Sequence, residues 1–162
     1  MPEDFHLSAF LPYRLAVLSE RVSRRLSVEY ERTHGLSVAE WRVLVHLQRC
    51  GKVSVRDIHD FVNLDKPRVS RAVARLEAAG MVRKLAGRVD GRLVDISLTA
   101  KGESALAEIV PIVTGIEARL LDGLTAAELS TFCAVMEKIH ARLDADSEAR
   151  PRSRLDALRE NA

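Results

Sequence analysis

The spacing of apolar residues along the chain predicts a mainly helical protein. Apolar positions recur at intervals of three and four in six segments, so we expect helices over residues 12–33, 37–50, 55–62, 65–80, 99–122 and 125–143. After Gly80 the period changes to two, which predicts strands over residues 81–86 and 93–98. The segment between the strands contains glycines and arginines, so we expect the strands to form a short hairpin.

The segment from Asp65 to Gly80 is the most informative of the predicted helices. Asp65 can cap its start, Pro67 fits its first turn, and Gly80 suits its end. One face of this helix is apolar and consists of Val69, Ala72, Val73 and Leu76. The rest of its surface is basic and carries Glu77 as its one acid. This profile is typical of a helix that lies in a DNA major groove, but a solvated basic face would look similar.

The neighbouring elements favour DNA binding. A short helix and a tight turn precede the basic helix, as in a helix-turn-helix, and the hairpin behind it is placed like a wing. Arginine at a narrow hairpin tip suits a minor groove, where negative potential is concentrated. We therefore predict that DNA is contacted by Ser54, Lys66, Arg68, Ser70, Arg71, Arg75, Arg88 and Arg92.

The outer helices carry more apolar surface than the compact part between them can cover. Pairing with a second copy would bury that surface and would present two basic helices to a pseudo-palindromic site. The predicted fold is mainly α with a small β-hairpin wing (α+β), a winged helix-turn-helix flanked by long dimerisation helices. We expect an N-terminal dimerisation helix (1–34), a DNA-binding lobe (35–98), C-terminal dimerisation helices (99–145) and a polar, Arg-rich tail (146–162).

The distribution of charge along the chain supports DNA binding more strongly than the net charge does. The chain of 162 residues has a net charge of only +2. Residues 65–92, however, hold eight lysines and arginines against three acidic residues. A basic block in an otherwise slightly acidic protein is the electrostatic footprint expected of a nucleic-acid contact.

Composition and spacing argue against several other classes. There is no basic region followed by an apolar core at the N-terminus and no apolar run of about 20 residues, so we expect a cytoplasmic protein. Cys50 and Cys133 lack a metal or redox spacing, and the five histidines share no ligand spacing. Without a nucleophile–base pair or a phosphate-binding glycine loop, we expect no enzyme activity, cofactor or metal.

The motifs of residues 11–143 resemble those of the MarR family of winged-helix transcriptional regulators. The resemblance lies in Leu36-Ser-Val-Ala-Glu-Trp-Arg-Val-Leu44, in Leu76-Glu-Ala-Ala-Gly-Met-Val-Arg83, and in Asp90-Gly-Arg92 followed by Leu98-Thr-Ala-Lys-Gly102. Many members have Asp-Arg-Arg at the wing, whereas here the middle residue is Gly91. That departure removes one basic contact from the predicted wing.

The resemblance implies a homodimer that binds operator DNA, usually as a repressor, and releases it when a small molecule arrives. Arg92 would then be the minor-groove residue of the wing, and Asp90 would stiffen the hairpin. Family ligands usually lie between the first, second and fifth helices. The candidate ligand residues here are Phe10, Tyr13, Arg14, Trp41 and His46, and an aromatic acid or its coenzyme A thioester is the implied effector class.

Alternative interpretations apply to several of these residues. Trp41 lies on an apolar face, so a core tryptophan is favoured over a ligand contact. Tyr13 and Arg14 would serve equally well to join two subunits. A second function class is also open, in which the same fold binds DNA without sequence preference or acts as a protein-interaction module.

Overall fold

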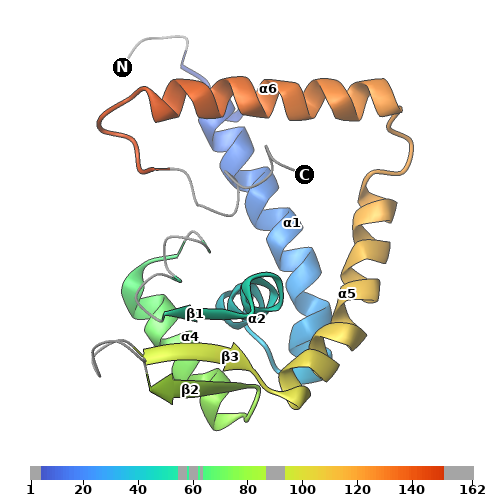
Figure 1. Ribbon diagram of the computed structural model, residues 1–162. Coiled ribbons are helices and arrows are strands. Elements are labelled where there is room, and N and C mark those ends of the chain that lie inside the picture. The colour runs from blue at the N-terminus through green and yellow to red at the C-terminus, as the bar shows by residue number, and fades with distance from the viewer. Residues whose placement is uncertain (1–4, 55–57, 59–61, 63, 87–93, 152–162) are drawn as a thin grey trace.

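The computed structural model describes residues 5–54, 58, 62, 64–86 and 94–151 (Figure 1). The described elements, in chain order, are η1 (Leu7–Ala9), α1 (Leu11–His34), α2 (Val38–Cys50), β1 (Lys52–Ser54), α4 (Lys66–Ala78), β2 (Val82–Ala86), β3 (Val94–Leu98), α5 (Ala100–Leu120) and α6 (Ala126–Asp144). The α+β fold class is confirmed: the protein combines long helices with a small antiparallel sheet in the order β1-β3-β2.

The core lies where α2, α4 and the sheet meet the C-terminal half of α1 and the first half of α5. Leu44 of α2, Val73 of α4 and Ile96 of β3 are all buried there, with Leu106 of α5. Each comes from the apolar stripe of its own element. Figure 1 shows this lobe at the bottom of the molecule, with α1 and α5 rising from it as two diverging arms.

The helix starts follow from local capping chemistry, and the cap predicted at Asp65 is present. At α2, the Glu40 amide donates to Ser37 Oγ and the Ser37 amide donates to Glu40 Oε2, which forms a capping box. Thr125 and Glu128 form the same arrangement at α6. Asp65 caps α4 by accepting the Arg68 amide at 2.8 Å.

The sheet holds one strand that the sequence analysis missed. Residues 52–54 form β1, which pairs antiparallel with β3 so that Val53 lies opposite Ile96. Ser54, which directly precedes the helix predicted over residues 55–62, is the last residue of this strand. The predicted helix over residues 55–62 falls mostly outside the described residues. The two strands of the predicted hairpin are confirmed, and Val82 pairs with Leu98 at the end away from the segment that connects them.

The first turn of α5 is fastened to the end of the basic helix. Thr99 caps α5, and its hydroxyl donates to the Gly80 carbonyl oxygen at 2.7 Å. Lys101 Nζ donates to the Ala79 carbonyl oxygen at 2.7 Å. These bonds satisfy carbonyl groups at the C-terminus of α4 and attach the first turn of α5 to the lobe.

The helix α6 buries no residue within the single chain. Its predicted apolar stripe is exposed or half-buried, and Phe132 is 47% exposed. Figure 1 shows α6 running across the far end of the arms, away from the sheet and α4. Among the described helices, none is long and apolar enough to span a bilayer.

Candidate nucleic-acid interface

The helix α4 has one buried face and one basic face. Its buried residues are the four predicted from the pattern: Val69, Ala72, Val73 and Leu76. The opposite surface is exposed and carries Lys66, Arg68, Ser70, Arg71 and Arg75. Since burial on α2 and β2 determines the rotation of the helix, the cationic side chains have to point to solvent.

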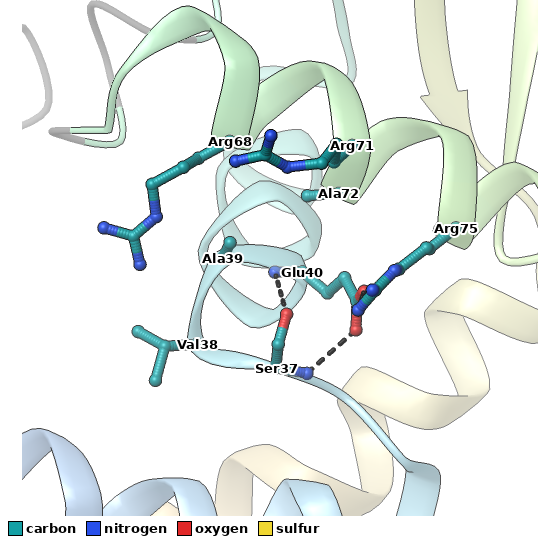
Figure 2. A pocket seen from close by; sticks show the side chains of 8 residues that line it. All are labelled: Ser37, Val38, Ala39, Glu40, Arg68, Arg71, Ala72 and Arg75. Atoms are coloured by element: carbon teal, nitrogen blue, oxygen red, sulfur yellow. Dashed lines mark hydrogen bonds and ion pairs between the residues drawn. The ribbon is translucent and has the colours of Figure 1, made fainter.

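A shallow open pocket of about 320 Å³ lies between this basic face and the start of α2 (Figure 2). Its lining consists of Ser37, Val38, Ala39, Glu40, Arg68, Arg71, Ala72 and Arg75. Three arginines thus line one side of the pocket, and the N-terminus of a helix lines the other. Both are favourable surroundings for an anion.

One acidic side chain is buried beside these arginines. Glu40 is only 5% exposed, and its Oε1 lies 3.7 Å from Nη1 of Arg75. Figure 2 shows the Arg75 side chain directed toward Glu40, whereas Arg68 points away from it. The Ser37–Glu40 spacing is that of a capping box, but no local pattern reports the contact of Glu40 with α4, because that contact joins two helices.

The remaining predicted DNA contacts lie around the sheet. Ser54 is half-buried in β1, opposite Asp95 of β3. Arg88 and Arg92, together with Asp90, lie outside the described residues, so the predicted wing tip stays a prediction.

The strands leading to the wing carry two further basic side chains that are held in place. Arg83 Nε donates to Ser97 Oγ at 3.1 Å across the β2–β3 pair. Lys84 forms an ion pair of 2.6 Å with Glu77 at the end of α4. The second contact ties the wing strands to the basic helix.

The start of the C-terminal tail also reaches this lobe. Arg150 Nη2 donates to the Leu64 carbonyl oxygen at 3.2 Å. Leu64 directly precedes Asp65, the residue that caps α4. A cation that the sequence placed only in a polar tail therefore lies next to the start of the basic helix.

The candidate ligand residues fall into two separate groups within one chain. Trp41 stacks on Tyr30 with ring centroids 5.3 Å apart, which supports its interpretation as a core residue. His46 is fully buried on the same helix, and burial lowers its pKa, with a further contribution from Arg49. Burial likewise raises the pKa of Tyr30, so both side chains are held in their neutral forms.

The other group lies at the start of α1. Phe10, Tyr13 and Arg14 are exposed, and Phe10 contacts Phe5 edge-on at 5.4 Å. At a rise of about 1.5 Å per residue, Arg14 lies about 24 Å along the helix from Tyr30. A single chain therefore does not bring the two groups together. Among the described residues, no cluster of His, Cys, Asp or Glu is arranged to hold a metal ion.

Comparison with known proteins places this arrangement in a family. A family model described as MarR family matches residues 34–93. The repressor Rv2887 of Mycobacterium tuberculosis is 29% identical over 131 residues, covering 80% of this chain and 91% of that protein. Both matches include the start of α2, the basic helix α4 and the segment leading to the wing.

Solved structures agree with this assignment. A MarR-family regulator from Silicibacter pomeroyi is 25% identical with a TM-score of 0.71, covering 88% of this chain and 95% of that one. Sco3205 from Streptomyces coelicolor, solved in complex with DNA, is 23% identical with a TM-score of 0.77, covering 92% and 95%. Bordetella bronchiseptica BpsR, whose DNA binding is regulated by 6-hydroxynicotinic acid, is 24% identical with a TM-score of 0.65, covering 78% and 98%. The chain, with its winged-helix lobe and outward-facing basic helix, belongs to the MarR family of transcriptional regulators.

Proposed function

We propose that this regulator is a homodimeric repressor that binds a pseudo-palindromic operator and is released from it by a small-molecule effector. In this proposal the lobe over residues 35–98 contacts DNA, and the flanking segments 1–34 and 99–145 form the dimer. The tail over residues 146–162 begins beside α4, where Arg150 adds one positive charge. The observation that carries the proposal is the basic face of α4, which is exposed while the opposite face is buried.

The DNA contact follows from the chemistry of that face. Arg68, Arg71 and Arg75 are spaced three and four residues apart, so they form one row along α4. An arginine in a major groove can donate two hydrogen bonds to one guanine, which discriminates against other bases by about 1–3 kcal/mol. Phosphate contacts that position the helix would come from Lys66, Ser70 and Arg88. Arg92 would enter the minor groove, with Asp90 supporting the hairpin.

The dimer is supported by apolar surface that the single chain leaves open. Large apolar side chains are exposed on the start of α1, the end of α5 and along α6, among them Leu11, Leu18, Leu120, Phe132 and Val135. Many large apolar side chains exposed on the same helices are typical of an association surface. Because α6 buries nothing in its own chain, a second copy is the partner we propose for it.

The effector site is proposed where two chains would meet. Arg14 is exposed and forms no ion pair with any described residue, so its guanidinium can receive a carboxylate or a phosphate. Phe10 and Tyr13 are exposed beside it and can contact a ring. The regulation of BpsR by 6-hydroxynicotinic acid supports an aromatic acid, or its coenzyme A thioester, as the effector class. Trp41 and His46 would line the inner end of such a site on α2.

A binding measurement on a selected DNA sequence tests the proposal. Wild-type protein should enrich one pseudo-palindrome from a random pool, and its affinity should fall steeply with salt. Arg71→Ala should weaken operator binding by about tenfold and reduce the slope of log affinity against log salt by about one if it binds phosphate. Arg119→Ala, on the last turn of α5 and away from α4, is the matched control.

A second measurement tests the effector. Aromatic acids that raise the melting temperature of the protein should also release it from the operator DNA.

Two results would contradict the proposal. If selection returned no motif, the protein would be a sequence-tolerant DNA binder or an interaction module on the same fold. If Arg71→Ala bound the operator as tightly as Arg119→Ala, α4 would not be the element that contacts DNA.

A further inference from the structure

The carboxylate of Glu40 has a charge that its helix does not need. A capping box requires an oxygen acceptor at the third helical position, and glutamine provides one as well as glutamate does. In this chain Glu40 Oε2 accepts the Ser37 amide at 2.8 Å, which completes the box. The other oxygen, Oε1, is turned toward α4, and the residue is 5% exposed.

The neighbour of that oxygen is an arginine on the basic face. Oε1 of Glu40 lies 3.7 Å from Nη1 of Arg75, and the Arg75 side chain is itself 74% exposed. The guanidinium therefore contacts a buried carboxylate on one side and solvent on the other. Arg68 and Arg71 line the same pocket but form no ion pair with any described residue.

This difference has a consequence for DNA recognition. A long unpaired arginine samples many rotamers, so part of its binding goes to whichever phosphate it meets, and that part carries no sequence information. A carboxylate 3.7 Å away attracts the guanidinium and favours the rotamers that keep Arg75 beside α2, while its N–H donors stay free for a base edge. The buried negative charge also weakens the general attraction of this part of α4 for phosphates. Both effects favour one sequence over others.

We propose that Glu40 is a positioning residue for sequence recognition, which directs Arg75 toward the DNA and thereby raises the ratio of operator affinity to random-sequence affinity. This role rests on the proposed function, since it requires α4 to lie against DNA. Glu40, a residue of α2, would thus contribute to sequence specificity without contacting DNA itself.

A double-mutant cycle with Glu40→Gln and Arg75→Ala tests this role. The glutamine keeps the acceptor of the capping box and removes the charge. We measure the affinities of wild type, both single variants and the double variant for the selected operator and for a scrambled duplex of equal length. Glu40→Gln should lower the affinity ratio by about three- to tenfold in the wild-type background and by less than about twofold beside Arg75→Ala.

Two controls separate this role from damage to the fold. Glu108→Gln removes a carboxylate charge from α5, where it pairs with His34 away from α4, and should leave the ratio unchanged. Ser37→Ala removes the other half of the α2 box while keeping the charge of Glu40, so any loss of affinity should be equal for both duplexes. Melting temperatures of all variants show whether the lobe stays folded.

Base selection gives an independent readout. Repeated selection with Glu40→Gln should lose preference at the same base positions as selection with Arg75→Ala. Three results would overturn the role of Glu40 without touching the proposed function. Glu40→Gln could act equally in both backgrounds, it could leave the affinity ratio unchanged, or it could lose base preference at positions other than those lost by Arg75→Ala. If wild type itself selected no sequence, the proposed function would fail first and this role with it.

Discussion

At the scale of single residues, His46 makes the stability of the lobe sensitive to acid. Its side chain is fully buried, with Nδ1 3.9 Å from Sγ of Cys50. Burial lowers the pKa of His46, with Arg49 adding to the effect, so the folded protein takes up this proton less readily than the unfolded chain. Stability is then highest above about pH 6.5 and falls as the pH decreases below it, because only the unfolded state is protonated there.

The variant His46→Leu should remove this part of the pH dependence. Urea denaturation between pH 7.5 and 5.0 should show a free energy of unfolding that falls less steeply for the variant than for wild type. The difference in slope is limited to about 1.4 kcal/mol per pH unit, since one proton is involved. Parallel profiles would mean that His46 takes up its proton equally well in the folded and unfolded states.

Gly102 is required by a close approach between two parts of the backbone. A Cβ at this position would overlap the Met81 carbonyl oxygen and would lie 3.2 Å from Cδ2 of Leu98. The Met81 oxygen cannot easily move away, because it accepts the Thr99 amide at 3.0 Å. The glycine therefore allows the first turn of α5 to pack on the end of the basic helix.

We expect Gly102→Ala to destabilise the protein by about 1–3 kcal/mol, the usual cost of an overpacked core position. Gly115→Ala on the same helix is the control, because its Cβ would meet only Arg119 Nη1 at 3.9 Å. That change should be neutral or stabilising by up to about 1 kcal/mol, since alanine favours helix. Chemical denaturation of both variants measures their free energies of unfolding. Equal changes in that free energy would show that the junction between α4 and α5 can shift to accept a methyl group.

The exposure of side chains could be predicted from the sequence wherever periodicity determines it. The outward direction of Arg68 and Arg71 followed from the burial of Val69 and Val73, and the structure confirms it. The contact between Glu40 and Arg75 could not be predicted in this way. It joins residues far apart in the sequence, and its distance depends on how α2 packs on α4.

At the scale of elements, helix ends were predictable because capping is local chemistry. The capping box at Ser37 and the cap at Asp65 each depend on a side chain that bonds to a backbone group three residues away. The strand β1 was missed for the opposite reason. Its three residues have no periodicity long enough to detect, and they are extended because β3 lies beside them.

At the scale of the whole molecule, the distribution of apolar surface divides the chain into a closed part and an open part. The lobe between α2 and β3 buries its core together with the adjoining ends of α1 and α5, whereas α6 buries none of its residues. The sequence indicated an excess of apolar surface on the outer helices but not where it would lie. In Figure 1 the exposed helix α6 lies on the far side of the molecule from α4. Two chains that associate through α6 would therefore keep the basic faces of both α4 helices available for DNA.

This separation predicts that the dimer can be broken without unfolding the chain. Phe132 is 47% exposed and lines an apolar hollow on α6 with Val135, so Phe132→Glu would place a charge in the proposed subunit contact. Burying an unpaired charge there costs several kcal/mol, enough to shift a micromolar sample from dimer to monomer. Ala134→Glu adds the same charge on the opposite side of α6 and should leave the dimer intact.

Sedimentation equilibrium measures the mass of both variants, and circular dichroism measures their helix content. We expect the Phe132→Glu variant to sediment at 18.0 kDa, the mass of one chain, with the helix content of the lobe retained. Operator affinity should fall when the dimer is lost. In a dimer, binding of one subunit to its half-site holds the second subunit at a high effective concentration near the other half-site. A Phe132→Glu protein that remained dimeric would place the subunit contact away from α6, whereas wild type sedimenting as a monomer would contradict the dimer itself.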